Sequence, residues 1–170
     1  ITYSLTHYND IKHARAEIDK SSTRSLPIYS LDTGLIFERN STVFGRETEQ
    51  TLEPRLFYAY IPYRNQRHMP NFDSSSADLN FAELFTPNKY TGFDRIANTN
   101  QLSAVLTTRY IDSGTGKEWF SATVGQRYYF TDEKVDLYWS NPGKTKNRSD
   151  VLAASQFSLF EGWRLEGASQ

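Results

Sequence analysis

Three arginines and two acids stand at alternating positions in segments with strand-like patterns, and these side chains could do chemistry. They are Asp32, Glu53, Arg55, Arg109 and Arg127. Because a guanidinium group can hold two oxygens of a phosphate, the arginines could bind phosphates of a ligand or polar groups of a neighbouring protein. The alternative, which we favour, is a set of salt bridges along one face of a sheet that offsets the cost of placing each charge there.

The run Gln50–Arg64 shows which element positions these groups, because side chains on a strand alternate between its two faces. One face of the run carries Glu53, Arg55, Phe57 and Ala59. The other face carries Leu52, Pro54, Leu56, Tyr58 and Tyr60. An apolar face opposite a face with an acid and a base is typical of a strand in a membrane-spanning β-barrel, where one side meets lipid and the other meets water.

The same alternation recurs along the chain. It is found at Tyr3–Leu5, Arg24–Arg39, Gln101–Ile111, Trp119–Phe130, Val151–Phe160 and Trp163–Gly167, with a further candidate strand at Val135–Trp139. We therefore predict an all-β fold, an antiparallel up-and-down meander of about seven strands. Residues 1–170 would form a fragment of one large outer-membrane β-barrel, and the fragment alone would not close, because open sheet edges are not tolerated in hydrocarbon.

The predicted connections alternate in length. The long loops cover 9–23, 65–94 and 131–149, and the shorter connections are Asn40–Glu49, Asp112–Lys117 and Glu161–Gly162. In Asp112–Lys117, Gly114 and Gly116 suit a tight turn because glycine accepts positive φ. Barrels of the outer membrane have long external loops and short periplasmic turns, so we expect the long loops outside the cell.

Composition excludes several classes of protein. The formal net charge is −1, which offers no broad basic field for nucleic acid. Hydrophobic content is 38% without an apolar run near the roughly 20 residues of a membrane helix, which excludes a helical membrane protein. No cysteine is present, so disulfides, zinc ribbons and thiol catalysis are excluded within this segment. The aromatic content of 15% suits the girdles of a membrane barrel.

No motif predicts an enzyme or a cofactor site. The sequence Gly-Thr-Gly-Lys ending at Lys117 lacks the glycine spacing of a phosphate loop and lies between two strands. The histidines His7, His13 and His68 share no metal-ligand spacing. The serines 74–76 have no glycine elbow, and no Ser, His and Asp set is visible. We therefore expect no catalytic residues, metal or cofactor.

Five sequence blocks carry a resemblance to a known family. TLEPR with YAYIPYR, then NFDSS at 71–75 and FDRIANTNQL at 93–102, stand between RSLPIYSLDTGLIFER upstream and VGQRYYF downstream. In this order and spacing they resemble the barrel domain of the LptD family of lipopolysaccharide-assembly proteins, also called organic solvent tolerance proteins. The resemblance covers residues 24–150 and places them in the middle of the barrel.

The resemblance implies a function in the outer membrane of a Gram-negative bacterium. The barrel would be part of the translocon that assembles lipopolysaccharide into the outer leaflet. The implied partners are lipopolysaccharide, outer-membrane lipids, an LptE-like lipoprotein plug and, through an N-terminal domain outside this segment, the periplasmic bridge proteins. Lipopolysaccharide would leave by a gap between the first and last strands, which also lie outside the segment, as do the cysteines of the family. The arginines would then touch lipopolysaccharide phosphates or the plug, although exit by the gap favours salt bridges.

The loop over 65–94 is long enough to be functional, as a lid on the outer mouth or as a mobile surface loop. Its residues Asn71, Asp73, Ser74 and Ser75 match the family block, so we favour an ordered loop folded onto the barrel. Asparagine and aspartate can also bond to their own backbone in such turns. Short ordered pieces are expected at 81–85 and 89–93.

Three other interpretations stay open. A general porin-type outer-membrane barrel shares the alternation, a soluble carbohydrate-binding β-sandwich would have polar outward faces, and an outer-membrane lipase ranks last for want of a nucleophile. The membrane interpretation requires that Leu56, Leu106 and Val124 do not lie in a dry interior between two packed layers.

Overall fold

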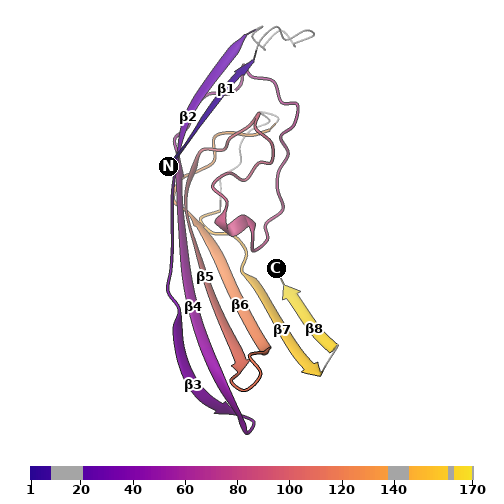
Figure 1. The fold of residues 1–170 in the computed structure, drawn as a ribbon. Coiled ribbons are helices and arrows are strands. Elements are labelled where there is room, and N and C mark those ends of the chain that lie inside the picture. The colour runs from indigo at the N-terminus through magenta and orange to yellow at the C-terminus, as the bar shows by residue number, and fades with distance from the viewer. Residues whose placement is uncertain (9–20, 138–145, 161–162, 170) are drawn as a thin grey trace.

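The structure, a computed structural model, describes residues 1–8, 21–137, 146–160 and 163–169, and its strands form one curved sheet (Figure 1). The strands are β1 (Thr2–Tyr8), β2 (Ser22–Gly34), β3 (Phe37–Val43), β4 (Arg46–Ile61), β5 (Thr99–Asp112), β6 (Glu118–Tyr129), β7 (Leu152–Phe160) and β8 (Trp163–Ser169). All pairs are antiparallel, in the order β1-β2-β4-β5-β6-β7-β8, with β3 beside β4. The predicted all-β antiparallel meander is confirmed.

Strands β2 and β3 form one long strand with a break at Leu35 and Ile36. Both pair with β4, and the register is the same on either side of the break. Pro54 lies opposite the break. The Leu35 amide donates to the Pro54 carbonyl at 3.0 Å, but proline has no N–H to donate in return. The missing donor in the middle of β4 explains the interruption.

The predicted connection Asn40–Glu49 is wrong for most of its length. Strand β3 continues to Val43 and β4 begins at Arg46, so Phe44 and Gly45 alone make the turn. Both have positive φ, 50° and 76°, as a two-residue hairpin turn requires. The hairpin is polar on both faces, so it lacks the alternation on which the prediction relied. Counting Arg24–Arg39 as one strand also explains why eight strands are found where about seven were predicted.

Other predicted boundaries shift by a few residues. Strand β4 ends at Ile61 instead of Arg64. Part of the candidate strand over 135–139 is described, and residues 135–137 belong to no strand. The rest of it, the turn at Glu161–Gly162 and most of the loop over 9–23 lie outside the described residues. The only helical element in the described part of the chain is a 3-10 turn, η1 (Glu83–Phe85), and no described helix is long and apolar enough to cross a membrane.

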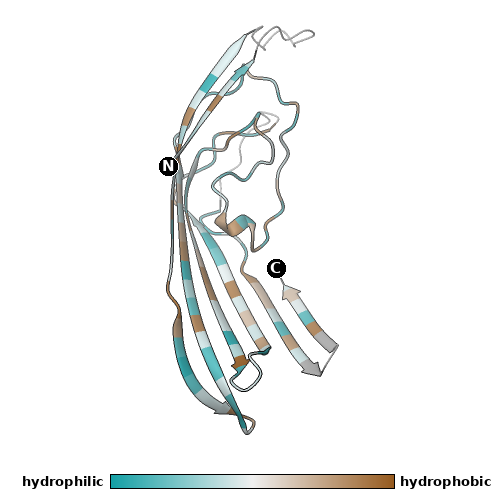
Figure 2. Ribbon diagram, in the orientation of Figure 1, coloured by the Kyte–Doolittle hydropathy of each residue, from teal (hydrophilic) through white to brown (hydrophobic). Residues whose placement is uncertain are grey.

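The β4–β5 connection and the described part of the β6–β7 connection lie at one end of the sheet, and the β3–β4 and β5–β6 turns lie at the other (Figure 1). The β4–β5 connection, residues 62–98 and here called the inner loop, folds back along the inner side of the curve. We call the covered side of the sheet the inner face and the opposite side the outer face. Hydrophilic and hydrophobic residues alternate along several strands (Figure 2). Because neighbouring side chains of a strand point to opposite faces, the two faces differ in composition.

The outer face is apolar and open. Leu56, Leu106 and Val124 lie on it and are 44%, 42% and 44% exposed. Between Tyr60 and Leu52 on β4, and across the strands paired with this stretch, the outer face carries no charged residue. No second sheet covers these side chains among the described residues, so the two-layer sandwich is excluded for this part of the chain.

Aromatic side chains border this apolar band at its upper and lower edges. Tyr29 and Tyr60 lie 6.2 Å apart at the upper border. At the lower border Phe120 lies 5.6 Å from Tyr110 and 6.1 Å from Phe157. From Tyr60 to the polar Gln50 on β4 is roughly 33 Å along the strand, and a tilt of about 40° reduces the height to about 25 Å. This height matches the hydrocarbon core that a membrane barrel must span.

Candidate functional site

The inner loop covers the inner face and packs against it through three apolar clusters. The residues that they bury are Leu26, Ile61 and Ile96, then Leu84, Val105 and Leu152, and then Tyr90, Ala97 and Val135. Each cluster combines residues of the inner loop with residues of the strands or of the β6–β7 connection. A connection of this length therefore has a core of its own, which accounts for its order.

The segment Phe93–Ala97 runs through the inner loop without belonging to a strand, and side chains bind its backbone. Asp73 accepts hydrogen bonds from the amides of Phe93 and Asp94, both at 3.2 Å. Gln66 accepts from the Ile96 amide at 3.2 Å and donates to the Ile96 carbonyl at 2.7 Å. Such bonds are needed because a buried backbone amide or carbonyl without a partner is costly.

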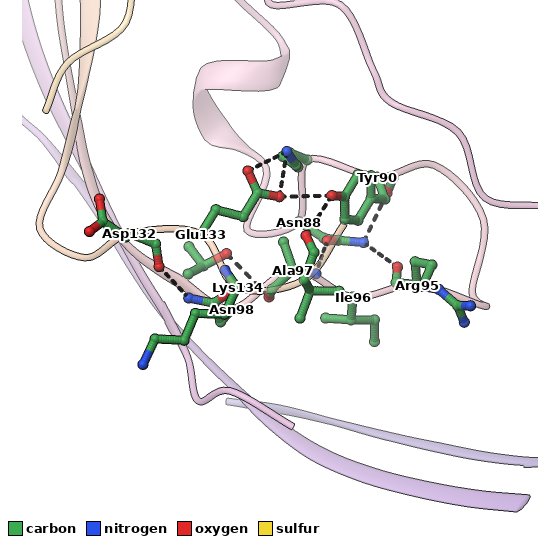
Figure 3. A network of polar contacts seen from close by, with 12 residues as sticks. Asn88, Tyr90, Arg95, Ile96, Ala97, Asn98, Asp132, Glu133 and Lys134 are labelled. Carbon is green, nitrogen blue, oxygen red and sulfur yellow. Dashed lines mark hydrogen bonds and ion pairs between the residues drawn. The ribbon is translucent and has the colours of Figure 1, made fainter. Parts of the chain in front are cut away.

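Asn88 continues this pattern on the same segment. Its side chain accepts from the Ala97 amide at 2.9 Å and donates to the Arg95 carbonyl at 3.2 Å (Figure 3). The Arg95 amide donates to the Ser74 hydroxyl at 2.9 Å. The carboxamides of Gln66 and Asn88 therefore pair with the backbone of this segment, as the backbone of a neighbouring strand pairs with β4.

The two sequence blocks at 71–75 and 93–102 bind each other through a reciprocal pair of aspartates, which we call the aspartate clasp. Asp73 accepts from the amides that begin the second block, as described above. Asp94 accepts from the amides of Phe72 and Asp73, at 2.5 and 2.8 Å, and also from the Tyr8 hydroxyl. Burial alone would raise the pKa of the Asp94 carboxyl, but these hydrogen bonds outweigh it and hold that pKa below its usual value.

Arg24 ties the clasp to strand β2. Its guanidinium donates to the carbonyls of Phe93 and Asp94 at 2.5 and 2.7 Å, to Gln66 at 2.8 Å and to the Thr6 hydroxyl at 2.9 Å. The residue is only 3% exposed. Sequence reasoning did not select Arg24 as a site residue. The one feature that could have indicated it is a charged residue near the start of β2, on the same face as Asp32.

Further polar contacts join the inner loop to the β6–β7 connection (Figure 3). The Asn98 side chain donates to the Asp132 carbonyl at 2.9 Å and accepts from the Lys134 amide at 2.7 Å. The Tyr90 hydroxyl contacts Glu133 at 2.7 Å, and burial together with this carboxylate raises the pKa of Tyr90. The two connections therefore form one structure at this end of the sheet.

Arg127 is a predicted site residue, and the structure places it under η1 on the inner face, 3% exposed. It donates to the Ser103 hydroxyl at 3.3 Å and to the Glu83 carbonyl of η1. Gly125, two residues before it, gives Leu84 room: a Cβ there would lie 2.7 Å from a methyl carbon of Leu84. The Arg127 side chain thus binds the backbone of η1 in the inner loop. Neither the phosphate-binding nor the salt-bridge interpretation of this residue predicted that contact.

The other predicted charges form pairs on the inner face. Arg55 donates to Asp32 at 2.9 Å, and its guanidinium lies 3.7 Å from the centre of the Phe85 ring. Arg109 bridges Glu53 and Glu118, each at 3.0 Å. Below η1 these strands border a cavity of about 620 Å³. Its lining includes Phe81, Phe85, Val105, Glu53, Arg55 and Arg109.

The predicted loop residues Asn71, Asp73, Ser74 and Ser75 all lie in ordered turns. Asn71 exchanges hydrogen bonds with the backbone of Ser74, both at 3.1 Å. The Ser75 hydroxyl contacts that of Thr91 at 2.7 Å. Their contacts in the structure are with other parts of the inner loop. Sequence reasoning did not identify their partners in the segment 91–95. It also missed Arg24, Gln66 and Asn88, whose side chains bind the backbone of 93–97.

The side chains selected above bind other side chains or the backbone of the described part of the chain, and these contacts do not form a catalytic set. Among the described residues no cluster of His, Cys, Asp and Glu could hold a metal ion. The predicted charges Asp32, Glu53, Arg55, Arg109 and Arg127 on the inner face bind other side chains there or the backbone of the inner loop, as described above. What the molecule presents is an apolar outer face, a polar inner face and an ordered loop that fills part of the space inside the curve.

Comparisons with known proteins agree with this geometry. A family model described as "LptD: LPS transport system D" matches residues 2–170. The chain is 44% identical over 169 residues to the LPS-assembly protein LptD of Paraburkholderia xenovorans, covering 99% of the chain and 21% of that protein. It is 47% identical over 159 residues to the same protein of Aromatoleum aromaticum, covering 89% of the chain and 20% of that protein.

A third relative, the LPS-assembly protein LptD of an Azoarcus species, is 51% identical over 132 residues, covering 78% of the chain and 16% of that protein. The chain thus spans about one fifth of the length of the relatives it matches. None of these descriptions names a catalytic activity. With a family model that covers nearly its whole length and a fold that suits part of a barrel, the chain belongs to the LptD family.

Proposed function

We propose that this chain forms part of the wall of an outer-membrane β-barrel that assembles lipopolysaccharide into the outer leaflet of a Gram-negative bacterium. The observation that carries the proposal is the contrast between the two faces of the sheet. Between Tyr60 and Leu52 the outer face is apolar, uncharged and bordered by aromatic rings, as acyl chains require. The inner face is polar and charged, as a passage for a saccharide requires.

The inner loop gives the wall a second role. It occupies the inner side of the curve at the end where the long connections lie, which we place outside the cell. An ordered loop in this position narrows the passage and limits free diffusion. This favours a dedicated translocon over a general porin. The named relatives are LPS-assembly proteins, which supports lipopolysaccharide as the substrate.

The partners follow from the same proposal. The cavity below η1 lies on the inner face, where an LptE-like lipoprotein plug would lie inside the barrel. Arg55 and Arg109 border this cavity, but both are paired with carboxylates, so we assign them to the structure of the wall before any role with phosphate. Periplasmic bridge proteins would act through a part of the full protein outside this chain.

A charge placed on either face tests the proposal. In the full-length protein, Leu106→Arg puts a charge on the outer face near mid-height, and Thr107→Arg, one residue along, puts the same charge on the inner face. We expect Leu106→Arg to cost about 2–4 kcal/mol and to reduce the assembled barrel, because arginine is costly at the membrane midplane. Thr107→Arg should assemble.

The measurements are the amount of barrel in the outer membrane and the lipopolysaccharide at the cell surface after the wild-type protein is depleted. Equal assembly of the two variants would contradict the assignment of the faces. Normal surface lipopolysaccharide in cells that lack the assembled barrel would contradict the transport function.

A further inference from the structure

Phe72 and Phe93 are the most exposed large apolar side chains of the inner loop, at 74% and 75%. Both residues directly precede an aspartate of the clasp. A phenyl ring in water is unfavourable, and exposed apolar groups on an ordered surface often mark a site of contact. Two such rings at equivalent positions of one motif therefore call for a physical explanation.

The clasp fixes the backbone of both phenylalanines. The Phe72 amide is bound by Asp94 at 2.5 Å, and the Phe93 amide by Asp73 at 3.2 Å. The Phe93 carbonyl is bound by Arg24 at 2.5 Å. The Phe72 ring lies near the Tyr8 ring, with the two ring centres 6.5 Å apart.

Gly92 shows how closely the two halves of the clasp approach. Its φ is +72°, and a Cβ at this position would lie 2.6 Å from the Asp73 carbonyl oxygen, which is backbone and cannot move aside cheaply. The close approach places the backbones of Phe72 and Phe93 next to each other. Three side chains, Arg24, Asp73 and Asp94, thus hold the backbone that carries the two rings. The rings themselves pack against little of the described chain.

We propose that Phe72 and Phe93 form a docking surface for the part of the same barrel that lies outside this chain. The chain covers only 21% and 20% of two relatives, so a barrel of their size has many more residues than this chain supplies. In a closed barrel the free edges of β1 and β8 pair with further strands. Those strands must return around the inner side of the curve, which is where the inner loop lies (Figure 1).

The location of the rings excludes acyl chains as the occupant. They belong to the inner loop, on the side of the sheet opposite Leu56 and Leu106, so they do not face the membrane. A second protein or the saccharide of the substrate are the competing occupants. The docking surface rests on the proposed closed barrel but not on its substrate.

Site-specific photo-crosslinking in the full-length protein tests the proposal. Benzoylphenylalanine replaces Phe72 or Phe93, and the control position is Phe44, which is 92% exposed at the opposite end of the sheet. After irradiation we expect crosslinks within one polypeptide at 72 and 93. Mass spectrometry should map them to peptides outside residues 1–170, and the control should not give these peptides.

Crosslinks from 72 and 93 to a second protein, to lipopolysaccharide or only to peptides within residues 1–170 would overturn the docking surface, and so would their absence. A second measurement uses Phe72→Ala with Phe93→Ala. This double variant should lower the temperature at which the barrel loses its compact migration in gels, whereas Phe44→Ala should not. An unchanged temperature would overturn the proposal. If no compact barrel forms even in the wild type, the proposed function fails; if it forms and the crosslinks go elsewhere, the docking surface alone fails.

Discussion

Strand β4 and the loop segment Phe93–Ala97 satisfy their backbone hydrogen bonds in different ways. Strand β4 pairs with backbone on both sides, over six residues with β2 and fourteen with β5. The segment 93–97 is bound by side chains of Arg24, Gln66, Asp73 and Asn88. A ladder of backbone bonds tolerates nearly any residue, whereas bonds from side chains depend on each residue type.

This difference predicts where substitutions do damage. On a strand of the sheet, a polar side chain at the surface can be removed with little loss, because the ladder persists. In the inner loop, the loss of one side chain leaves several backbone groups unpaired together. The contrast can be tested in the full-length protein with one probe throughout, the substitution Ala97→Cys. Ala97 is 3% exposed, so a thiol introduced there should react with a labelling reagent only when the loop opens.

The largest effect is expected for Arg24→Ala. It removes four hydrogen bonds, including those that the carbonyls of Phe93 and Asp94 accept from this guanidinium. We expect the free energy of loop opening to fall by about 3–5 kcal/mol. The loss of hydrogen bonds from a charged group and the loss of donors to largely buried groups both contribute to this change. The measurement is the labelling rate of the thiol introduced by Ala97→Cys. The reference protein carries Ala97→Cys and keeps Arg24.

The matched control for Arg24→Ala is Arg39→Ala. Arg39 is exposed on β3, and its described contact is one hydrogen bond to Gln50 at 2.7 Å. We expect a change of less than about 0.5 kcal/mol. Equal labelling in the two alanine variants would mean that the inner loop does not depend on its side-chain bonds.

A smaller effect is expected for Gly125→Ala. The added methyl group would lie 2.7 Å from Leu84 and 3.0 Å from Val105, so η1 must move away from the sheet. Overpacking of this kind costs about 1–3 kcal/mol. Adding Leu84→Ala should recover part of the loss because it makes room. If the double variant labels faster than Gly125→Ala alone, the steric explanation is wrong.

The smallest effect is a dependence on pH carried by Asp94. Its pKa is lower in the folded loop than in the unfolded chain, so the carboxylate stabilises the loop above about pH 4. This stabilisation is lost as the pH falls through the folded pKa. We expect Asp94→Asn to cost about 1–2 kcal/mol at pH 7 and to reduce the acid dependence.

Urea titrations of loop opening at pH 7 and at pH 3 measure this dependence, with a pyridyl disulfide as the labelling reagent because it still reacts with thiols in acid. Asp78→Asn, at an exposed position of the same loop, serves as the control and should behave as the wild type. Full retention of the acid dependence in Asp94→Asn would show that other carboxylates carry it.

The sequence made the sheet predictable and the inner loop only partly so. Alternation identifies a strand because its apolar side chains must all face lipid, and the positions of Leu56, Leu106 and Val124 on the outer face agree with this expectation. Alternation fails at the β3–β4 hairpin, whose residues 38–40 are all polar. There the turn chemistry of Phe44 and Gly45 was the only signal, and phenylalanine is unusual at positive φ.

The partners within the inner loop could not be read from the chain. Arg24 and Asp94 are 70 residues apart, and no local pattern indicates that a guanidinium on β2 will bind that carbonyl. The block at 71–75 could be selected as ordered, yet its order comes from Asp94 and Arg95, which the fold brings against it. Side-chain bonds to distant backbone have no period, so only the three-dimensional structure reveals them.

Pro54 gives the wall a crease. Leu35 donates to the Pro54 carbonyl without a bond in return, so this position of the β2–β4 seam has one backbone hydrogen bond where a regular antiparallel pair has two. We expect amides beside this position to exchange with solvent deuterium sooner than those along the β4–β5 seam. The long strand formed by β2 and β3 can bend here while β4 stays paired with β5, which gives a stiff shell one place where it yields.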